Sequence, residues 1–166
     1  MEMNLEIAGR SISLKNKKII FIGSGQQAKN FLPIFFKKKI YVETLCGTRK
    51  SILNLKKLKK KYKIKNIETD IKKALLNYNY DYVFVCINWN KIEKEIFKII
   101  KYAKGSIYVE KPIALSKKNL IKIINYKNKF KKKVYVMYNR RFYNSINIIK
   151  NNINKRKKIN FHINIP

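Results

Sequence analysis

A short glycine-containing segment near the N-terminus combines residue types suited to binding a diphosphate. Residues 23–28 read Gly-Ser-Gly-Gln-Gln-Ala, the pattern G-x-G-x-x-A. Gly23 permits a tight turn, Gly25 lets a phosphate approach the backbone because it lacks a Cβ, and Ala28 allows close helix–strand packing. Backbone N–H groups at the start of a helix would then face the anion. The pattern predicts a pyrophosphate site for a dinucleotide, although an ordinary strand-to-helix turn can carry the same residues.

A Glu-Lys-Pro tripeptide offers chemistry of a different kind. Glu110, Lys111 and Pro112 follow directly after the apolar run 106–109. A lysine ammonium at the carboxyl end of a strand can hold a substrate hydroxyl or carbonyl oxygen, and a neighbouring glutamate can orient it. Lys111 is therefore a candidate for the residue that contacts the reacting group of a bound substrate.

The end of the predicted strand 39–46 bears on the type of dinucleotide. An Asp or Glu at this place usually holds a free ribose 2′-hydroxyl. Here the chain continues with Gly47, Thr48, Arg49 and Lys50. A hydroxyl and two cations suit a 2′-phosphate, so the sequence favours NADP over NAD. The alternative is that Arg49 and Lys50 are exposed turn residues without a ligand.

Strands and helices are predicted to alternate around these motifs. Strands are expected at 19–22, 39–46, 64–67, 82–87, 106–109 and 134–138, and helices at 28–36, 51–61, 71–76, 91–103 and 116–131. The pattern predicts an α/β fold, a Rossmann-type doubly wound and mainly parallel sheet of about six strands. The continuously apolar run 82–87 predicts a central strand. Asn88, at its carboxyl end, could touch a ligand or cap the next helix.

Helical spacing also predicts which side chains face inward. Pro33 is expected to kink the first helix or end it early, and Asp70 is expected to cap the helix 71–76. The inner faces of the helices 51–61 and 116–131 are predicted to contain Ile52, Leu53, Leu55 and Leu58, and Leu120, Ile121, Ile123 and Ile124, respectively.

The composition favours a globular protein with a strongly basic surface. The chain has 166 residues, a formal net charge of +31, and 40 Lys and Arg residues against nine acidic residues. This charge invites a nucleic-acid partner, but few of the basic residues are Arg and the lysines are spread along the whole chain. We therefore interpret most of the charge as a solvated surface, with nucleic acid unlikely as the main partner.

Other residue types narrow the class of protein further. No apolar run approaches the ~18 residues of a membrane span, and Glu2 and Glu6 argue against a signal peptide. A cytoplasmic protein without a membrane partner is expected. Cys46 and Cys86 are predicted to be buried, reduced thiols, with a disulfide or metal pair as the alternative. His162 is expected to be a solvated strand residue, and no metal site is predicted.

In collinear order, the motifs resemble the glucose–fructose oxidoreductase / inositol dehydrogenase (Gfo/Idh/MocA) family. The resemblance covers about residues 17–155 and is carried by the turn 23–28, the tripeptide 110–112 and Tyr-Asn-Arg-Arg-Phe at 138–142. It implies an NAD- or NADP-binding Rossmann domain. It also implies an oxidoreductase that moves hydride to or from a small-molecule substrate: a sugar, a cyclitol or a related alcohol or carbonyl compound.

The resemblance assigns expected roles to individual residues of this chain. The pyrophosphate is expected at Gly23, Gly25, Gln26 and Gln27, the adenosine ribose at Thr48 and Arg49, and the nicotinamide ribose at Asn88, Glu110 and Lys111. Lys111 is the expected catalytic or substrate-holding residue. Asn139 and Arg141 are expected to border the substrate.

Two departures from the family pattern qualify the expected activity. Family chains usually carry a His shortly after the fourth strand, and residues 89–92 supply none. Family chains also continue into a C-terminal α/β domain that brings an Asp and a His for proton transfer. This chain is therefore expected to have an N-terminal arm (1–16), a Rossmann domain (17–142) and a stub of the second domain, a helix and first strand (143–166).

A stub with an apolar strand over 158–165 has no visible sheet to join. We therefore expect either self-association into a homo-oligomer or binding of a complementing chain. Two alternative functions remain open from the sequence. One is a non-catalytic nucleotide-binding module or remnant, and the other, less favoured, is a polyanion-binding basic protein.

Overall fold

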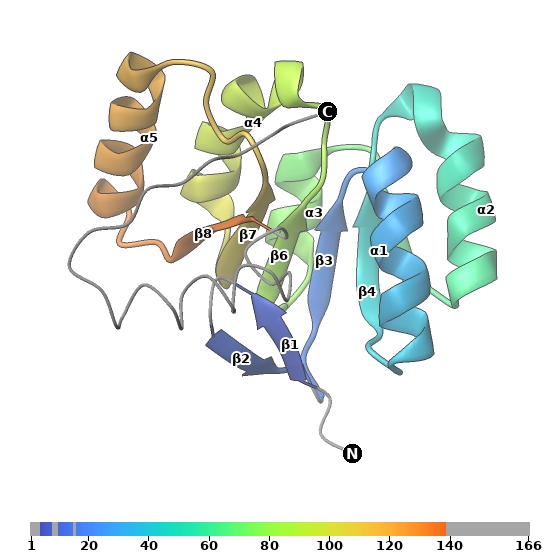
Figure 1. Ribbon diagram of the computed structural model, residues 1–166. Helices are drawn as coiled ribbons and strands as arrows, with labels where there is room; N and C mark the ends of the chain where they lie inside the picture. The colour runs from blue at the N-terminus through green and yellow to red at the C-terminus, as the bar shows by residue number, and fades with distance from the viewer. Residues whose placement is uncertain (1–3, 8–9, 15, 139–166) are drawn as a thin grey trace, which may run out of the picture.

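A six-stranded parallel sheet forms the centre of the fold (Figure 1). The computed structural model describes residues 4–7, 10–14 and 16–138. The strand order is β5-β4-β3-β6-β7-β8. The strands are β3 (Ile19–Ile22), β4 (Val42–Cys46), β5 (Asn66–Glu68), β6 (Tyr82–Val85), β7 (Ser106–Glu110) and β8 (Val134–Met137). The predicted doubly wound, parallel α/β fold is thus confirmed.

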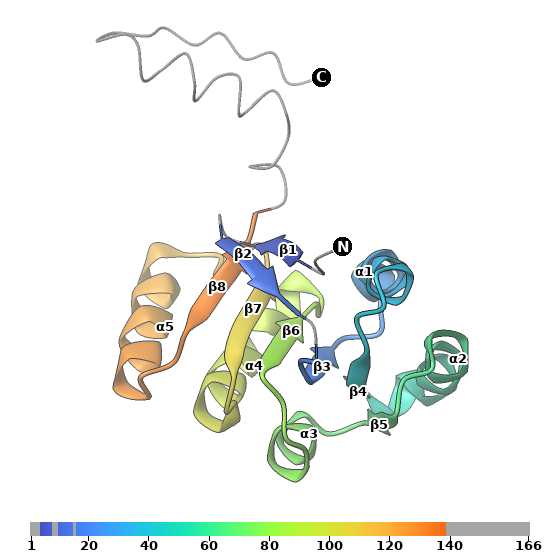
Figure 2. The same cartoon turned by 90° about the horizontal axis from the view of Figure 1, so that it is seen from below.

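Helices cover both faces of this sheet, as the view from below in Figure 2 shows. They are α1 (Gln26–Lys37), α2 (Ile52–Tyr62), α3 (Ile71–Asn77), α4 (Trp89–Tyr102) and α5 (Lys117–Lys129). One buried cluster joins the sheet to α1 and α2, and a second joins it to α3, α4 and α5. The chain therefore winds in one direction from β3 to β5 and then in the other from β6 to β8.

The centre of the sheet is apolar on both faces, as the sequence predicted for the run 82–87. Val83, Phe84 and Val85 of β6 are fully buried. Rings from four neighbouring strands stack in register across one face, with centroid distances of 6.2, 5.2 and 5.2 Å, and they belong to Phe21, Phe84, Tyr108 and Tyr135. This packing fixes the relative heights of β3, β6, β7 and β8, and therefore the level at which their carboxyl ends meet.

The inner faces of two helices differ from the prediction. Leu53 of α2 is 79% exposed, because α2 packs through Leu55 and Leu58. In α5 only Ile123 is buried, whereas three expected core residues are each at least 40% exposed, namely Leu120, Ile121 and Ile124. The reason is position, since α5 lies beside the edge strand β8 and part of its apolar surface has no described strand to cover.

The first helix does not break at its proline. α1 continues past Pro33 to Lys37, so the predicted early end is wrong. Asp70 caps α3 as predicted, since its carboxylate accepts a hydrogen bond from the backbone N–H of Lys73 at 2.8 Å. Within the described residues, no helix is both long and apolar enough to cross a membrane.

The N-terminal arm predicted for residues 1–16 contains two short strands. β1 (Asn4–Ile7) and β2 (Arg10–Ser13) form an antiparallel hairpin that is separate from the main sheet. In Figure 2 the hairpin lies on the same side of the sheet as α1. Leu14, which follows β2, is buried in the cluster on that side. The predicted helix and strand of the C-terminal stub (143–166) lie outside the described residues.

Candidate functional site

The direction of chain winding reverses between two neighbouring strands of the sheet. β3 and β6 are paired in parallel, with Ile22 opposite Val85. β3 leads to helices on one face and β6 to helices on the other. In open α/β sheets, ligands bind at the carboxyl ends of the strands where the winding reverses. The residues that follow β3, β4, β6 and β7 are therefore the candidate site.

The glycine turn after β3 is pressed against the end of β6. Gly23 is buried and has a φ of +118°, a conformation that side chains with a Cβ rarely adopt. A Cβ at Gly23 would overlap the backbone carbonyl of Cys86. The N–H of Gly23 donates to the Cys46 carbonyl at 2.7 Å. Gly23 thus closes the turn between the ends of β4 and β6, in the way predicted for the first glycine of the motif.

The second glycine leaves open space at the start of α1. Apart from the adjacent residues, no heavy atom lies within 4 Å of the position that a Cβ on Gly25 would take. Gly25 is the N-cap of α1, no side chain caps this end, and the first turn contains no acidic residue. The first intrahelical bond runs from Lys29 N–H to the Gly25 carbonyl, so the N–H groups before Lys29 have no intrahelical acceptor. These exposed donors and the positive end of the helix dipole fit a diphosphate.

The two glutamines of the motif lie at this same helix end. Gln26 and Gln27 are exposed, and their side chains hydrogen-bond to Asn30 one turn later, at 3.3 and 3.4 Å. Their amide side chains are thus bonded within the helix, whereas their backbone N–H groups have no intrahelical acceptor.

The turn after β4 has a defined shape with two cations on its surface. Thr48 N–H donates to the Ser51 hydroxyl at 2.9 Å, and that hydroxyl donates to the Thr48 carbonyl at 2.9 Å. Between them, Arg49 and Lys50 begin the short 3-10 helix Arg49–Ser51 and are exposed. Neither cation forms an ion pair within the part of the chain that the structure describes. The turn therefore presents free positive charge at the same edge as Gly25.

A side chain that the sequence did not single out joins these two turns. Asn54, in the first turn of α2, donates its Nδ2 hydrogen to the Ser24 carbonyl at 2.6 Å. The contact spans 30 positions of sequence. An asparagine in a helix rich in Lys and Leu carries no local signal of such a role, so pattern analysis could not find it.

The carboxyl end of β6 leads directly into α4. Asn88 is the N-cap of α4, and its side-chain oxygen accepts a hydrogen bond from Asn90 N–H at 3.3 Å. The capping role considered for Asn88 is thus present, and its contact with a nicotinamide ribose stays a prediction. Trp89 follows and is 55% exposed. It is the single tryptophan of the chain, so it reports on events at this edge of the sheet.

Lys111 lies at the same edge as the glycine turn. β3, β6 and β7 are consecutive parallel strands, with Ile22, Val85 and Val109 in register. Two strand spacings, about 10 Å, therefore separate the chain at Gly23 from the chain at Glu110. Lys111 is exposed and its peptide bond to Pro112 is cis. The structure thus places the backbone at Lys111 and the glycine turn at the same edge of the sheet.

The neighbouring carboxyl group has an unusual environment. Glu110 is only 8% exposed, and burial raises the pKa of its carboxyl above the ordinary value, against the opposing effects of the Lys111 charge and a hydrogen bond from the Lys111 backbone N–H. Perturbed carboxyl groups in such positions are common in functional sites.

The raised pKa of Glu110 predicts a specific dependence of stability on pH. A carboxyl whose pKa is higher in the folded state stabilises the fold below its unfolded pKa, and this contribution is lost as the pH rises through the folded pKa. We expect Glu110→Gln to flatten the fall in unfolding free energy between pH 4.5 and pH 7, measured by urea unfolding. Glu95→Gln, which removes a carboxyl paired with Lys98, is the control and should retain this part of the slope.

The loop after Lys111 is fixed by a second unpredicted contact. Glu93 of α4 accepts hydrogen bonds from the Leu115 N–H at 2.6 Å and from the Asn119 side chain at 3.0 Å. The Glu93 carboxylate therefore holds the segment between β7 and α5, and so limits the positions that Lys111 can take. No sequence motif marks Glu93, because its partners lie more than 20 residues away.

Cys46 is the last residue of β4 and Cys86 follows directly after β6, and both lie inside the core. Both thiols are free and buried, as predicted. Burial raises the pKa of Cys46 to about 12, with smaller contributions from Glu68, Asp70 and Glu95, and burial likewise raises the pKa of Cys86. They are protonated and unreactive at neutral pH. Across residues 4–7, 10–14 and 16–138, no three His, Cys, Asp or Glu side chains are grouped to bind a metal ion.

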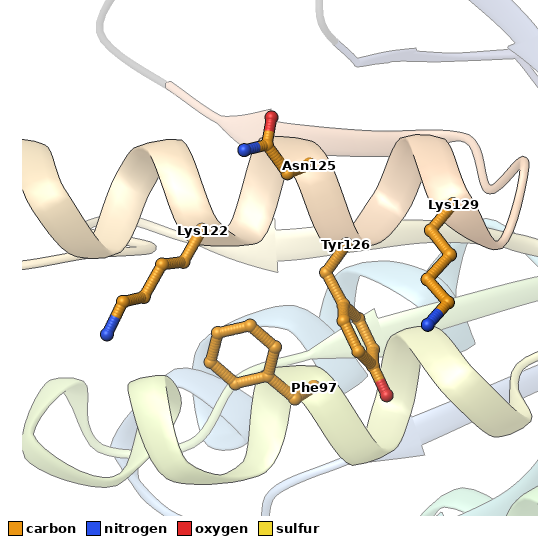
Figure 3. A pocket seen from close by; sticks show the side chains of 5 residues that line it. All are labelled: Phe97, Lys122, Asn125, Tyr126 and Lys129. Carbon is orange, nitrogen blue, oxygen red and sulfur yellow. The ribbon is translucent and has the colours of Figure 1, made fainter.

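A shallow hollow lies away from this edge, on the outer surface between α4 and α5 (Figure 3). The rings of Phe97 and Tyr126 meet edge to face at 5.1 Å and form its floor, with Lys122 and Lys129 at its ends. It contains none of the predicted site residues. The expected substrate-side residues Asn139 and Arg141, and also His162, lie outside the described residues.

Solved structures of dehydrogenases share this fold. A Gfo/Idh/MocA family oxidoreductase from Vibrio cholerae has 23% identity and a TM-score of 0.70, and 84% of this chain matches 44% of that chain. The myo-inositol 2-dehydrogenase from Lactobacillus plantarum has 14% identity and a TM-score of 0.73, and 84% of this chain matches 41% of that chain. The WlbA dehydrogenase from Bordetella pertussis, solved with NADH and UDP-GlcNAcA, has 14% identity and a TM-score of 0.73, and 83% of this chain matches 42% of that chain. The chain therefore spans about two-fifths of the length of these structures.

These similarities confirm, at the level of the fold, the resemblance to Gfo/Idh/MocA dehydrogenases, and the matched part is their Rossmann-type unit. No curated protein matches the chain by sequence. Residues 18–110 match the family model described as "NADP oxidoreductase coenzyme F420-dependent". This match includes the glycine turn, the Thr48–Arg49 turn and Glu110, and it covers more than half of the chain. The protein therefore belongs to this oxidoreductase family.

Proposed function

We propose that this chain binds a nicotinamide dinucleotide, NADP in preference to NAD, at the carboxyl edge of its sheet. We further propose that it serves an oxidoreductase acting on a sugar, a cyclitol or a related alcohol or carbonyl compound. The observation that carries the proposal is the uncapped start of α1 beside Gly25, which offers free N–H donors and open space. Structures of similar fold support it, since one is a myo-inositol dehydrogenase and another was solved with NADH.

The chain's own residues would hold the dinucleotide at three places along this edge. The diphosphate would lie against the N–H groups at Gly25, Gln26 and Gln27, because this helix end has no other acceptor. The adenosine ribose would lie at Thr48 and Arg49, directly after the neighbouring strand β4. The nicotinamide half would extend across the end of β6 toward β7.

Near the nicotinamide half of the dinucleotide, Asn88 and Trp89 follow β6 and Lys111 follows β7. A bound nicotinamide supplies hydride transfer. Lys111 would donate a hydrogen bond to the substrate oxygen and stabilise the negative charge that develops on it. Glu110, the buried last residue of β7, would lie beside the nicotinamide ribose and next to the residue that carries this ammonium. Asn139 and Arg141 remain proposed substrate-side residues.

The preference for NADP rests on charge at the end of β4. Arg49 and Lys50 are exposed and make no ion pair with a described residue, so both are available to a 2′-phosphate. The name of the matching family also includes NADP. Glu43, the carboxylate earlier in β4, pairs with Lys65 at 3.0 Å, which directs it away from the turn.

Titration with reduced cofactors tests this proposal through Trp89. We expect NADPH to quench Trp89 emission and to bind at least about tenfold more tightly than NADH. Arg49→Ala should weaken NADPH binding about tenfold, the cost of one charge-assisted hydrogen bond, and should leave NADH within about twofold. Lys56→Ala, which removes an exposed charge from α2, is the matched control.

Different results would contradict different parts of the proposal. Equal affinities for NADPH and NADH in the wild type and in Arg49→Ala would contradict the NADP preference alone. An absence of quenching by either dinucleotide would contradict nucleotide binding itself. Binding without oxidation of NADPH by any carbonyl substrate would support a nucleotide-binding module instead. Self-association through the strand predicted over 158–165 stays a prediction.

A further inference from the structure

We propose that Asn54 is a positioning residue of the dinucleotide site, which holds the diphosphate-binding turn in its open shape. This inference rests on the proposed nucleotide binding. Asn54 touches no predicted ligand position, and it acts through the Ser24 carbonyl. Ser24 lies between the two glycines of the turn, so its orientation sets that of the peptide planes on either side.

The geometry of the contact supports a directed role. The distance from Asn54 Nδ2 to the Ser24 oxygen is 2.6 Å, and the contact is partly buried. A peptide plane whose carbonyl is held toward α2 turns its opposite N–H away from α2. The carbonyl between Ser24 and Gly25 belongs to the peptide that carries the Gly25 N–H. Asn54 therefore keeps this carbonyl, which would repel an anion, out of the open space beside Gly25.

The same helix start also holds the turn after β4. Ser51 exchanges hydrogen bonds with Thr48 through its hydroxyl, and Asn54 stands one turn later on the same helix. A Cβ on Gly47 would come within 3.1 Å of the Leu55 side chain, so the end of β4 packs closely against α2. The start of α2 thus supports the proposed diphosphate turn (23–28) through Asn54 and the proposed adenosine turn (47–51) through Ser51, the N-cap of α2.

This separation of roles leads to a test with two probes. NADPH engages both turns, whereas adenosine 2′-phosphate lacks the diphosphate and engages the adenosine turn alone. We expect Asn54→Leu, which keeps the size of the side chain and removes the donor, to weaken NADPH binding about tenfold and to leave adenosine 2′-phosphate binding within about twofold. Asn54→Gln, which retains an amide donor, should recover part of the NADPH affinity.

The controls separate positioning from a general effect on the fold. Lys57→Leu changes an exposed residue in the same helix and should affect neither probe. An equal loss of both probes in Asn54→Leu, with a lower urea midpoint, would overturn the proposal, because Asn54 would then only support α2. Unchanged NADPH affinity would also overturn it. If the wild type bound neither probe, the proposed nucleotide binding would fail and the role of Asn54 would fail with it.

Discussion

The Gly25→Asp variant is expected to fold as well as the wild type and to lose dinucleotide binding by at least about a hundredfold. Gly25 has a φ of −82°, which any residue can adopt, and a Cβ there would meet no heavy atom within 4 Å apart from those of the adjacent residues. Aspartate is a preferred N-cap residue, whereas glycine caps more weakly. The substitution therefore stabilises α1 by up to about 1 kcal/mol.

The same carboxylate would occupy the space proposed for the diphosphate. It would satisfy the free N–H groups at the start of α1 and repel a second anion. Binding and stability are thus expected to change in opposite directions, a result that general damage to the fold does not produce. Titration of NADPH with Trp89 emission as the signal, together with urea unfolding, measures both quantities.

A charge-matched control separates local from long-range effects. Asn125→Asp introduces the same charge on the exposed surface of α5, far along the sheet from the glycine turn, and should leave NADPH affinity within about twofold. If Gly25→Asp bound NADPH as well as the control, the diphosphate could not lie beside Gly25. The proposed site would then be wrong.

Gly23→Ala is expected to be the most destabilising single-methyl change in the turn, by about 3 kcal/mol or more. Two costs add at this position. The φ of +118° is strained for alanine, and the added Cβ would overlap the Cys86 carbonyl. Because β3 and β6 are both central strands, neither can shift without disturbing the buried clusters on both faces.

The matched comparison is Gly25→Ala, two residues further along the turn. This change adds the same methyl group in open space, and because alanine caps a helix less well than glycine it should lower the unfolding free energy by no more than about 1 kcal/mol. Urea midpoints of the two variants provide the measurement. Equal midpoints would show that the turn can move away from β6, contrary to the close contact in the structure.

The sequence alone determined the order of the elements and the position of the main motifs. Strand and helix alternation, the central run 82–87 and the glycine turn all depend on residues close together in the chain. Local periodicity and backbone preference encode such features directly. Alternating strands and helices form a parallel sheet, and the carboxyl ends of its strands meet at one edge. Gly23 and Lys111 each follow such a strand, so both lie at that edge.

The tertiary structure decided which side chains support these motifs and which apolar positions are buried. The contacts of Asn54 with Ser24 and of Glu93 with Leu115 join residues 30 and 22 positions apart, and such pairs arise only when helices pack beside a completed sheet. Leu53, Leu120 and Ile124 have the spacing of core residues, yet they are exposed. Periodicity defines the apolar face of a helix, but the extent of its burial depends on how much of the sheet lies beneath it.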